Sequence, residues 1–597
     1  MPSFRTQWFS SSSARITIRV LRIIAIVVAV LAAILLLLLF IHRGLLPIVA
    51  YFIPQLHTSF LDLAVYGPVP TQKFVSFDLN APKPWRTCWD KSCDGGNILV
   101  GPNGPSVTQA GPVILDTNGE LVWMTHDYRT IMNFNIQKYR GEDFITFWTG
   151  NKTGGNGQGE MIMLDSNYKV AYRIQAVGEG NKGDIHEFRI TDDDTALIAV
   201  SNKTQADLRS WPGFRPSDGW LVDGMFQEVD IETGELLFEW RAINHMDPIE
   251  NYYFDPFGGY FESHPYDYYH LNSIEKDYEG NYLTSSRHFH HLAYIDGRTG
   301  EVLWTLGGMS NSFKDLSHGK ATEHQWQHNA RWVDREQGIV SFMDNGAAGP
   351  LHVDAPFSKG TMVQLDLEKM TAKRLHSYVS PSKVRAASQG NLQVMNDDQV
   401  LVGWGATAAY TEFTMDGTPL CEVHFSASSM FWFERWKTYR VYRHFGWVGQ
   451  PEYPPSARIR GDSIYVSWNG ATEVVFWELQ GSREEEGDDY ESLDTIEKQH
   501  FEESFVLPTD GDFVRFQVAA LDGNRKVLHA SDPVAPEGGL GWFAGLATGI
   551  SVVVGFGLGV WFVLRFWVRR RRREGREGFT WLPTELFWRG DYHYSKL

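Results

Sequence analysis

A short pattern recurs six times along the chain and constrains its fold more than any other feature. An apolar strand ends in Asp, a few turn residues follow, and a second apolar or aromatic strand begins. The six turns lie at Asp116, Asp165, Asp230, Asp296, Asp366 and Asp416. Asp with Asn or Gly in such a turn favours the positive φ angles of a tight hairpin.

The spacing of the turns indicates how the hairpins are organised. Intervals of 49, 65, 66, 70 and 50 residues leave room for four strands in each unit. Four-stranded sheets repeated around an axis form a propeller, so the sequence predicts an all-β, six-bladed β-propeller over residues 70–430. An array of β-sandwiches is the alternative, but it would not place the same residue classes at equivalent repeat positions.

The pattern changes after the sixth unit. Residues 450–535 alternate apolar and polar side chains, as half-buried strands do. We expect an immunoglobulin- or fibronectin-III-like β-sandwich with Trp468 and Trp477 in its core. This domain would act as a spacer between the propeller and a membrane.

Two apolar runs predict membrane attachment. Residues 23–41 are uninterruptedly apolar and long enough to cross a bilayer as a helix. Residues 541–564 form a second uncharged run, followed by a cluster of arginines. Positive flanks before the first run and after the second predict that residues 1–22 and 565–597 are both cytosolic, with the large domain lumenal or extracellular. A cleaved signal peptide is the alternative for the first run.

The charge distribution narrows the possible partners. Residues 1–44 and residues 541–597 each carry a net charge of +5. The whole chain has a net charge of −18, so the residues between them carry −28. So acidic a surface repels nucleic acid, and no nucleic-acid partner is expected.

Glycosylation sequons at Asn151 and Asn202 agree with a lumenal middle region. Cys88 and Cys93 could close a small disulfide loop with Cys421 unpaired, or remain free thiols.

Three histidines occupy one equivalent position in successive repeats. His186, His270 and His328 each begin a strand that precedes a hairpin, where Phe134 and Gly390 stand in two other repeats. The innermost strands of a propeller line its central channel, so these side chains should converge. Asn272 shares a face with His270, and Arg287 ends the neighbouring strand. Imidazole, amide and guanidinium donors together suit a small oxyanion.

A metal site is the competing interpretation of the three histidines. Arg287 nearby argues against a cation, so neither a metal nor another cofactor is expected. The remaining histidines of this region are assigned to loops or blade edges without chemistry: His264, His288, His290, His291, His318 and His324.

Several segments resemble the arylsulfotransferase family, in its fungal-type branch. They are DIHEFRIT, YYHLNSIEKDYEGNYLTSSR with IDGRTGEVLWTLGG, QHNARWVD and SQGNLQVMNDDQVLVGWG, and the similarity covers residues 70–430. The resemblance implies a propeller enzyme that moves a sulfuryl group from an aryl sulfate to a phenol without a nucleotide donor, through a sulfated histidine.

The same resemblance assigns roles to individual residues. His328 matches the nucleophile, and His186, His270, Asn272 and Arg287 match the sulfate-binding and proton-transfer set. Further candidates for substrate contact are Ser388 and Gln389. Three aromatic side chains could stack on a phenol ring: Trp326, Phe134 and Tyr269. The two membrane segments and the C-terminal sandwich depart from the bacterial pattern of the family and leave the acceptor open. A non-catalytic receptor or scaffold that binds protein or glycan remains the alternative function.

Overall fold

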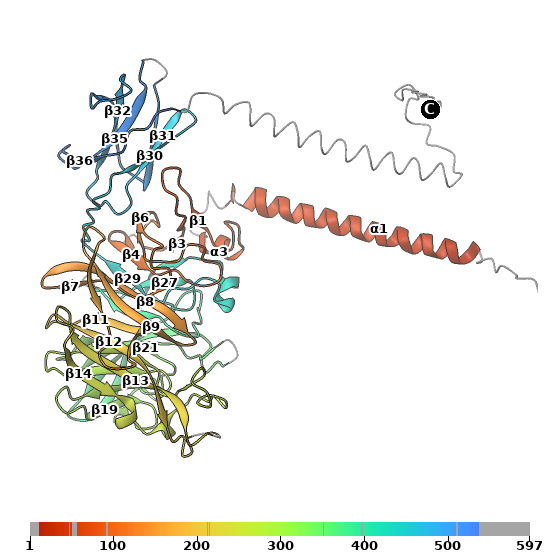
Figure 1. Ribbon diagram of the computed structural model, residues 1–597. Coiled ribbons are helices and arrows are strands. Elements are labelled where there is room, and N and C mark those ends of the chain that lie inside the picture. The colour runs from red at the N-terminus through yellow and green to blue at the C-terminus, as the bar shows by residue number, and fades with distance from the viewer. Residues whose placement is uncertain are drawn as a thin grey trace, which may run out of the picture. The chain divides into compact units, whose positions relative to one another are not determined.

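The computed structural model describes residues 11–46, 48–49, 57–90, 93–211, 213, 215–349, 352–395, 398–508 and 512–536. Its described strands belong to the first of two compact units, Met1–Val534, and the second unit, Ala535–Leu597, lies outside the described residues except for 535–536. Strands far outnumber helices among the described residues, so the protein is all-β (Figure 1).

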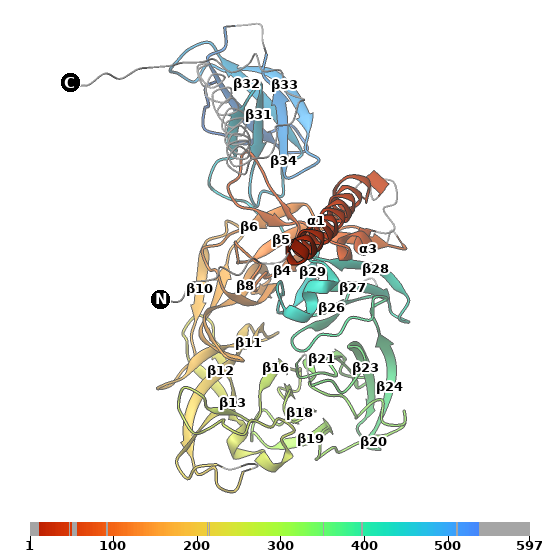
Figure 2. The same cartoon turned by 90° about the vertical axis from the view of Figure 1, so that its right-hand side faces the viewer.

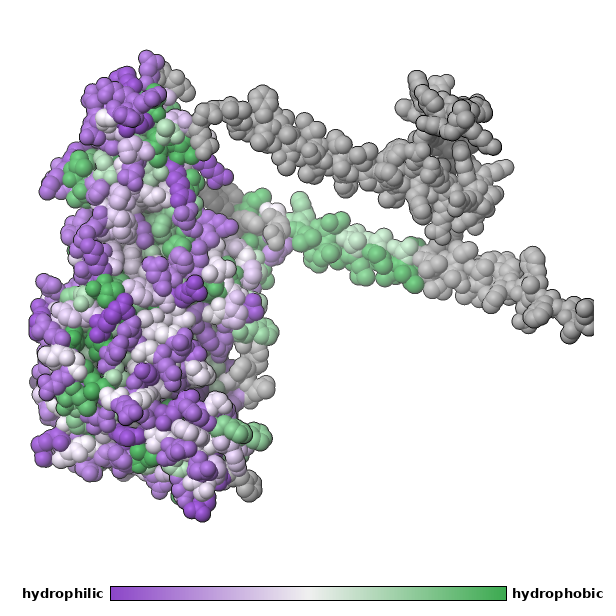
Figure 3. Space-filling model, viewed as in Figure 1, coloured by the Kyte–Doolittle hydropathy of each residue, from purple (hydrophilic) through white to green (hydrophobic). Residues whose placement is uncertain are grey.

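One helix is long and apolar enough to cross a membrane by its length and composition. Helix α1 (Ser11–Phe40) contains the apolar segment Ile23–Phe40, whose side chains are exposed and appear as a continuous hydrophobic surface in Figure 3. Such a helix could be a signal anchor or a membrane span. The second predicted segment, residues 541–564, lies outside the described residues. The shorter helices are the π-helix Ile41–Leu45, α3 (His57–Asp62) and the 3₁₀ helices Ala242–Asn244, Pro248–Glu250 and Ser428–Phe433.

The six predicted hairpins are confirmed. In each, the turn Asp accepts backbone N–H groups; Asp165 Oδ1, for example, accepts from the nitrogens of Asn167 and Lys169 at 2.9 Å each. Equivalent bonds form at the other five turns. The hairpin strands are β5 (Val113–Asp116) and β6 (Leu121–Met124), β9 (Asn156–Leu164) and β10 (Val170–Ile174), β13 (Gly219–Asp230) and β14 (Leu236–Arg241), β18 (His291–Ile295) and β19 (Val302–Gly307), β23 (Lys359–Asp366) and β24 (Thr371–Tyr378), β27 (Ala409–Thr414) and β28 (Pro419–His424).

Two further strands precede most hairpins and complete the sheets. The inner ones are β29 (Val441–His444), β7 (Ile131–Tyr139), β11 (Lys182–Ile190), β16 (Leu271–Lys276), β21 (His328–Asp334) and β25 (Asn391–Val394). The second ones are β4 (Asn97–Val100), β8 (Glu142–Thr153), β12 (Thr195–Ala206), β17 (Tyr282–Ser286), β22 (Ile339–Asp344) and β26 (Gln399–Gly403). The inner strands contact one another in the order given, and β26 contacts β29. Figure 2 shows the resulting ring, a propeller-like arrangement.

One sheet of the ring is larger than the sequence predicts. A single pairing of Gly183 with Gly159 joins β11 to β9, so the second and third units form one nine-stranded sheet in the described part of the chain. Two glycines allow this close approach, because a Cβ on Gly183 would lie 2.8 Å from the Gly159 carbonyl oxygen.

Strands from both ends of the region close the ring. Strand β29 is hydrogen-bonded to β4, which lies more than 300 residues earlier in the sequence. Strand β3 (Trp85–Cys88) adds to β28 in the last sheet. Three short ladders complete the region: β1 (Thr71–Gln72) with β2 (Ala81–Pro82), β15 (Tyr266–Asp267) on β13, and β20 (Lys314–Asp315) on β24.

Two further sheets follow β29. One contains β30 (Ser456–Arg460), β31 (Ser463–Ser467) and β34 (Glu502–Val506). The other contains β32 (Phe476–Ser482), β33 (Glu491–Glu497), β35 (Arg515–Leu521) and β36 (Val527–Ala530). They share one apolar core, in which Trp468 and Trp477 are both buried.

Candidate active site

Irregular backbone at the inner strands places the three histidines. The pairing of β11, β16 and β21 with their neighbours shifts register at Gly183–Phe188, Leu271–Ser273 and His328–Arg331. His270 itself has φ 52° and Asn329 has φ 56°. Left-handed backbone is uncommon outside glycine, although Asn and His adopt it more often than most residues, and bulges re-aim the side chains beside them.

Two of the histidines are paired with buried carboxylates. His186 Nδ1 donates to Asp184 Oδ2, and His270 Nδ1 donates to Asp267 Oδ2 at 2.5 Å. The two imidazole rings meet edge to face with 4.6 Å between centroids. In both rings the proton is therefore on Nδ1 and the lone pair of Nε2 is directed away from the carboxylate.

The environment of His270 balances two opposing effects. Burial lowers the pKa of His270, and Asp267 opposes that change. Burial acts to raise the pKa of Asp267, but His270 outweighs it and holds that pKa below its ordinary value. Asp267 is therefore an anion at neutral pH, and it stabilises a proton on His270 whenever one arrives.

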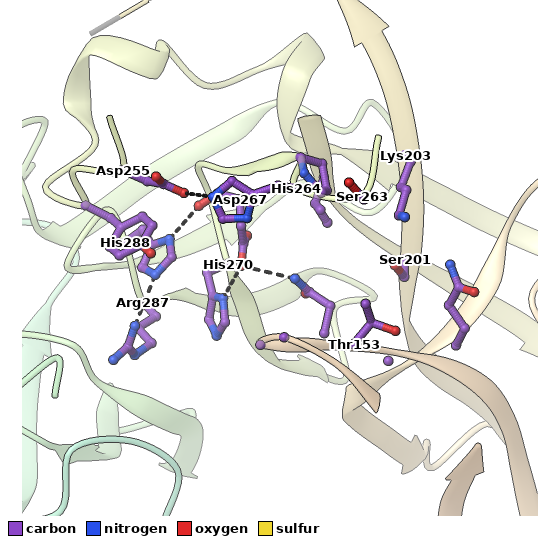
Figure 4. A pocket seen from close by; sticks show the side chains of 18 of the residues that line it. Thr153, Ser201, Lys203, Asp255, Ser263, His264, Asp267, His270, Arg287 and His288 are labelled. Carbon is purple, nitrogen blue, oxygen red and sulfur yellow. Dashed lines mark hydrogen bonds and ion pairs between the residues drawn. The ribbon is translucent and has the colours of Figure 1, made fainter. Parts of the chain in front are cut away.

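Arg287 lies next to this pair, joined to it by His288 (Figure 4). His288 Nδ1 donates to the Asp267 carbonyl oxygen at 2.7 Å, and Arg287 Nη1 donates to His288 Nε2 at 3.0 Å. Tyr253 stacks on the His288 ring at 4.2 Å. Burial lowers the pKa of Arg287 to about 10, so its guanidinium is still charged at neutral pH.

His328 has neutral partners only. Its Nδ1 donates to Asn345 Oδ1 at 2.7 Å and to the Trp326 carbonyl oxygen at 3.0 Å. Its Nε2 accepts a hydrogen bond from the Gln389 backbone nitrogen at 3.2 Å. Burial, and next the charge of Arg287, lower the pKa of His328 well below its usual value. The ring is thus a neutral imidazole, the form that a nitrogen nucleophile requires, and its Nε2 lone pair is bonded to the Gln389 backbone N–H.

Arg287 and His328 are held against the same segment of chain. Arg287 Nη2 donates to the carbonyl oxygens of Ala348 and Ala387, both at 3.2 Å. Ala387 is two residues from Gln389, which contacts His328. Asn272 is also close, since its Nδ2 donates to the carbonyl of Gln327, the residue before His328, at 2.7 Å. The structure therefore brings together all five residues of the predicted channel set.

A cavity of about 360 Å³ opens beside this cluster. His270, Arg287, His288 and Tyr253 form one part of its wall, and the β8–β9 hairpin forms another. Gly155 in that hairpin lies close over His270, because a Cβ there would be 3.3 Å from the ring. His186 and His328 are buried and do not line this cavity.

The remaining predicted residues have other positions. Gln389 is buried beside His328 through its backbone, and neither Ser388 nor Gln389 lines the cavity. Trp326, Phe134 and Tyr269 are buried in the protein core, and Tyr253 is the aromatic side chain that the described cavity wall contains. His288 lies in the turn between β17 and β18, as predicted, but it lines the cavity and contacts Arg287 and Asp267.

Sequence reasoning missed the residues that orient the histidines. Asp184, Asp267 and Asn345 contact the three imidazoles. The first two stand two and three residues before their histidines, a spacing that was visible in the sequence. Asn345 lies 17 residues beyond His328, across the β21–β22 hairpin, and no local pattern indicates it.

One group in the site has metal-ligand spacing. Ligand atoms of Asp267, His270 and His288 lie within 4.8 Å of one another. Asp267 Oδ2 and His270 Nδ1 are bonded to each other, and both ring nitrogens of His288 have hydrogen-bond partners.

The cysteines differ from the sequence expectation of a Cys88–Cys93 loop. Cys421 on β28 lies within bonding distance of both Cys88 and Cys93, with Cα–Cα separations of 4.2 and 6.4 Å. The pairing of β3 with β28 brings these residues together across more than 320 positions, so it could not be read from local spacing. One sulfur forms one disulfide at a time, and Cys421 therefore takes one of the two partners.

The two sequons are in different settings. Asn151 is exposed at the end of β8. The side chain of Asn202 is half-buried, and its amide donates to Asn181 Oδ1 at 2.6 Å.

Comparisons with known proteins give one family match and several distant structural similarities. Residues 135–426 match the family model described as arylsulfotransferase (ASST). The chain thus contains an arylsulfotransferase-family domain over that range, and all the predicted channel residues fall within it. No curated protein matches the chain.

Solved structures are similar at low identity. A protein of unknown function from Bacteroides caccae is 13% identical, with 58% of this chain and 98% of that one covered and a TM-score of 0.34. A streptogramin B lyase is 9% identical, with 64% and 94% covered and a TM-score of 0.30. The Cps50 (Swd1) β-propeller domain of Myceliophteria thermophila is 8% identical, with 57% and 94% covered and a TM-score of 0.28.

Proposed function

We propose that this protein transfers a sulfuryl group from an aryl sulfate to a phenolic acceptor through a sulfohistidine at His328. The observation that carries the proposal is the contrast among the three clustered histidines. His186 and His270 have carboxylate partners, whereas His328 has an amide and a carbonyl and is kept neutral. That division of partners suits two proton-handling residues and one nucleophile inside an arylsulfotransferase-family domain.

The first half-reaction forms a nitrogen–sulfur bond. The reaction requires that His328 Nε2 is released from the Gln389 N–H and opened to the cavity. Its lone pair then attacks the sulfur of the aryl sulfate, and the bond from sulfur to the phenolic oxygen breaks. His270, protonated at Nε2 when the anionic donor is bound, gives that proton to the departing oxygen, and Asp267 stabilises the charged ring meanwhile. Arg287 and Asn272 hold the sulfuryl oxygens, where negative charge is concentrated.

The second half-reaction restores the protein. His270, now neutral, takes the proton of an incoming phenol, whose oxygen attacks the sulfur. The nitrogen–sulfur bond breaks, and its electron pair returns to His328 Nε2. Throughout, Asn345 Oδ1 and the Trp326 carbonyl oxygen accept the Nδ1 proton of His328, which fixes the ring and stabilises positive charge on it. His186 is assigned to the same sulfate-binding and proton-transfer set, and Ser388 and Gln389 to further substrate contact.

We also propose an architecture for the whole chain. The six hairpins mark six blades over residues 70–430, and residues 450–535 form a fibronectin-III- or immunoglobulin-like sandwich. Residues 23–41 and 541–564 span the membrane, as in the fungal-type form that the sequence resembles, with both tails cytosolic and sugar chains at Asn151 and Asn202. Protease protection of sealed vesicles tests this topology: digestion of the large domain from the cytosolic side would contradict it.

The test of the proposed function uses the detergent-solubilised full chain. With 4-nitrophenyl sulfate alone, we expect an intact-mass increase of one sulfuryl group, and with a phenol added we expect release of 4-nitrophenol. His328→Ala should abolish both signals, whereas His126→Ala, a change at an exposed loop histidine, should abolish neither. A folded protein that neither forms the adduct nor turns over any aryl sulfate would instead support a binding protein.

A further inference from the structure

The cavity has a second polar end, which the proposed chemistry does not use. Lys203 lines it on β12, and in Figure 4 it lies on the opposite side of the pocket from Arg287. Ser201, two residues before it, lines the cavity as well, because alternate residues of a strand share one face. Asn202 between them belongs to the other face, where it bonds to Asn181.

Lys203 carries a positive charge with no close counter-charge. Among the described residues, its Nζ has one hydrogen-bond partner, the backbone oxygen of Glu262 at 3.0 Å. No described carboxylate lies within salt-bridge distance of it. An ammonium group has three N–H donors, so two remain for a ligand.

The side chains around Lys203 are neutral hydrogen-bonding groups. Ser201, Ser263, Thr153 and Gln158 all line the cavity, and the hydroxyls and amide of these residues have no hydrogen-bond partner in the described part of the chain. Ser201 is buried. Hydroxyl and amide donors beside an ammonium group form a binding site for a carboxylate, sulfate or phosphate.

The carboxylates that line the cavity bond to groups other than Lys203. Asp255 accepts from the backbone nitrogens of Phe257 and Gly258 at 3.1 and 3.0 Å and lies 3.0 Å from His264 Nε2. Asp267 is bonded to His270. Both carboxylates are thus held by local donors, and neither neutralises Lys203.

We infer that the substrate is a phenol, or its sulfate ester, that carries a second anionic group at the end of the molecule remote from the reacting oxygen. The reacting oxygen lies at Arg287 and His270, and the second anion binds Lys203 and the hydroxyls around it. A volume of about 360 Å³ is at the small end of ligand pockets and fits one substituted ring. This inference rests on the proposed function for the reaction, but not for the binding of the second anion.

The test compares two ligands, one that carries the second charge and one that lacks it. Binding of 4-hydroxyphenylacetate and of its uncharged methyl ester is measured by calorimetry on the full chain, together with their use as acceptors. We expect the acid to bind about tenfold more tightly, the size of one charge-assisted contact. In Lys203→Gln the preference should disappear, and in Lys203→Glu it should reverse.

The matched control is Lys182→Gln, an exposed lysine on the neighbouring strand outside the cavity wall, which should keep the tenfold preference. Equal binding of acid and ester by the unaltered protein, or a preference that survives in Lys203→Gln, would overturn the inference even if sulfuryl transfer occurs. A Lys203-dependent preference without any transfer would keep the anion site and refute the transferase.

Discussion

At the scale of single residues, the hydrogen-bond partners of the three histidines distinguish their roles better than the positions of these histidines in the repeats do. All three histidines occur at equivalent repeat positions, and all three hold their proton on Nδ1. They differ in what accepts that proton: Asp184, Asp267 or the neutral Asn345. A carboxylate raises the proton affinity of its histidine strongly, whereas a neutral amide oxygen orients the ring and raises its proton affinity less.

This difference predicts the behaviour of Asp267→Asn. Loss of the anion removes the group that opposes the burial-induced fall in the pKa of His270, so His270 is protonated less often at neutral pH. We expect kcat to fall about 10²-fold for donors with poor leaving groups such as phenyl sulfate, within the range typical of general acids. For 4-nitrophenyl sulfate, whose leaving group needs little protonation, the fall should be much smaller.

The leaving-group dependence separates an acid-catalytic role from a structural one. A merely damaged site would slow both donors equally, and that outcome would contradict the assignment. Asp255→Asn is the control, because Asp255 lines the same cavity but bonds to His264 instead of His270.

At the scale of elements, local signals were predictable and long-range pairings were not. The six hairpins were evident because an Asp turn is encoded within a few residues. The predicted strand starts at Phe134 and His186 were wrong, since β7 and β11 begin earlier, at Ile131 and Lys182. The joining of β3 to β28 and of β29 to β4 depends on contacts across more than 300 residues. The bulge at His270 and the distant Asn345 left no repeating pattern, whereas Asp184 and Asp267 stand close to their histidines and could have been identified.

The β3–β28 pairing leads to a prediction about the disulfide. The Cα separation of 6.4 Å between Cys93 and Cys421 falls within the usual range of about 4.4–6.8 Å, and the 4.2 Å of Cys88 falls just below it. Non-reducing peptide mapping after alkylation should therefore find Cys93 joined to Cys421 and Cys88 alkylated. In Cys93→Ser the link should move to Cys88.

The disulfide of Cys421 should also contribute to the free energy of unfolding of the closed ring. Because the bond would close a loop of more than 320 residues, Cys421→Ser should lower the free energy of unfolding by about 2–5 kcal/mol. A Cys88–Cys93 peptide, or alkylation of all three thiols, would refute this closure. Stoichiometric zinc in the purified protein would also refute it, since three thiolates this close could bind a metal instead.

At the scale of the whole molecule, one buried ion cluster connects four sheets directly beneath the histidines. Glu187 on β11 bonds to Arg331 on β21 at 2.6 Å and to Arg440, just before β29, at 2.7 Å. Arg440 also donates to the carbonyl oxygens of His186 and Asn272, at 3.1 and 3.0 Å. The cluster therefore fixes the backbone of two predicted site residues while it holds the ring together.

Glu187→Gln tests whether this cluster stabilises the ring. Burial alone would raise the pKa of Glu187, but Arg331 and Arg440 outweigh it and lower that pKa to about 2. A carboxyl whose folded pKa is depressed contributes stability that is complete above its unfolded value of about 4.5 and is lost as the pH falls towards 2. Because the change leaves two buried arginines without their anion, we expect the free energy of unfolding at pH 7 to fall by about 3–5 kcal/mol.

Urea unfolding of the full chain between pH 7 and pH 3 measures both effects. The unaltered protein should lose stability below pH 4.5 more steeply than Glu187→Gln, and Glu336→Gln, a change at an exposed glutamate, should follow the unaltered curve. If Glu187→Gln is as stable as the unaltered protein at pH 7, the buried charges do not hold the ring together. The packing of the sheets and the two strand closures would then have to account for how the histidines from different sheets stay in contact.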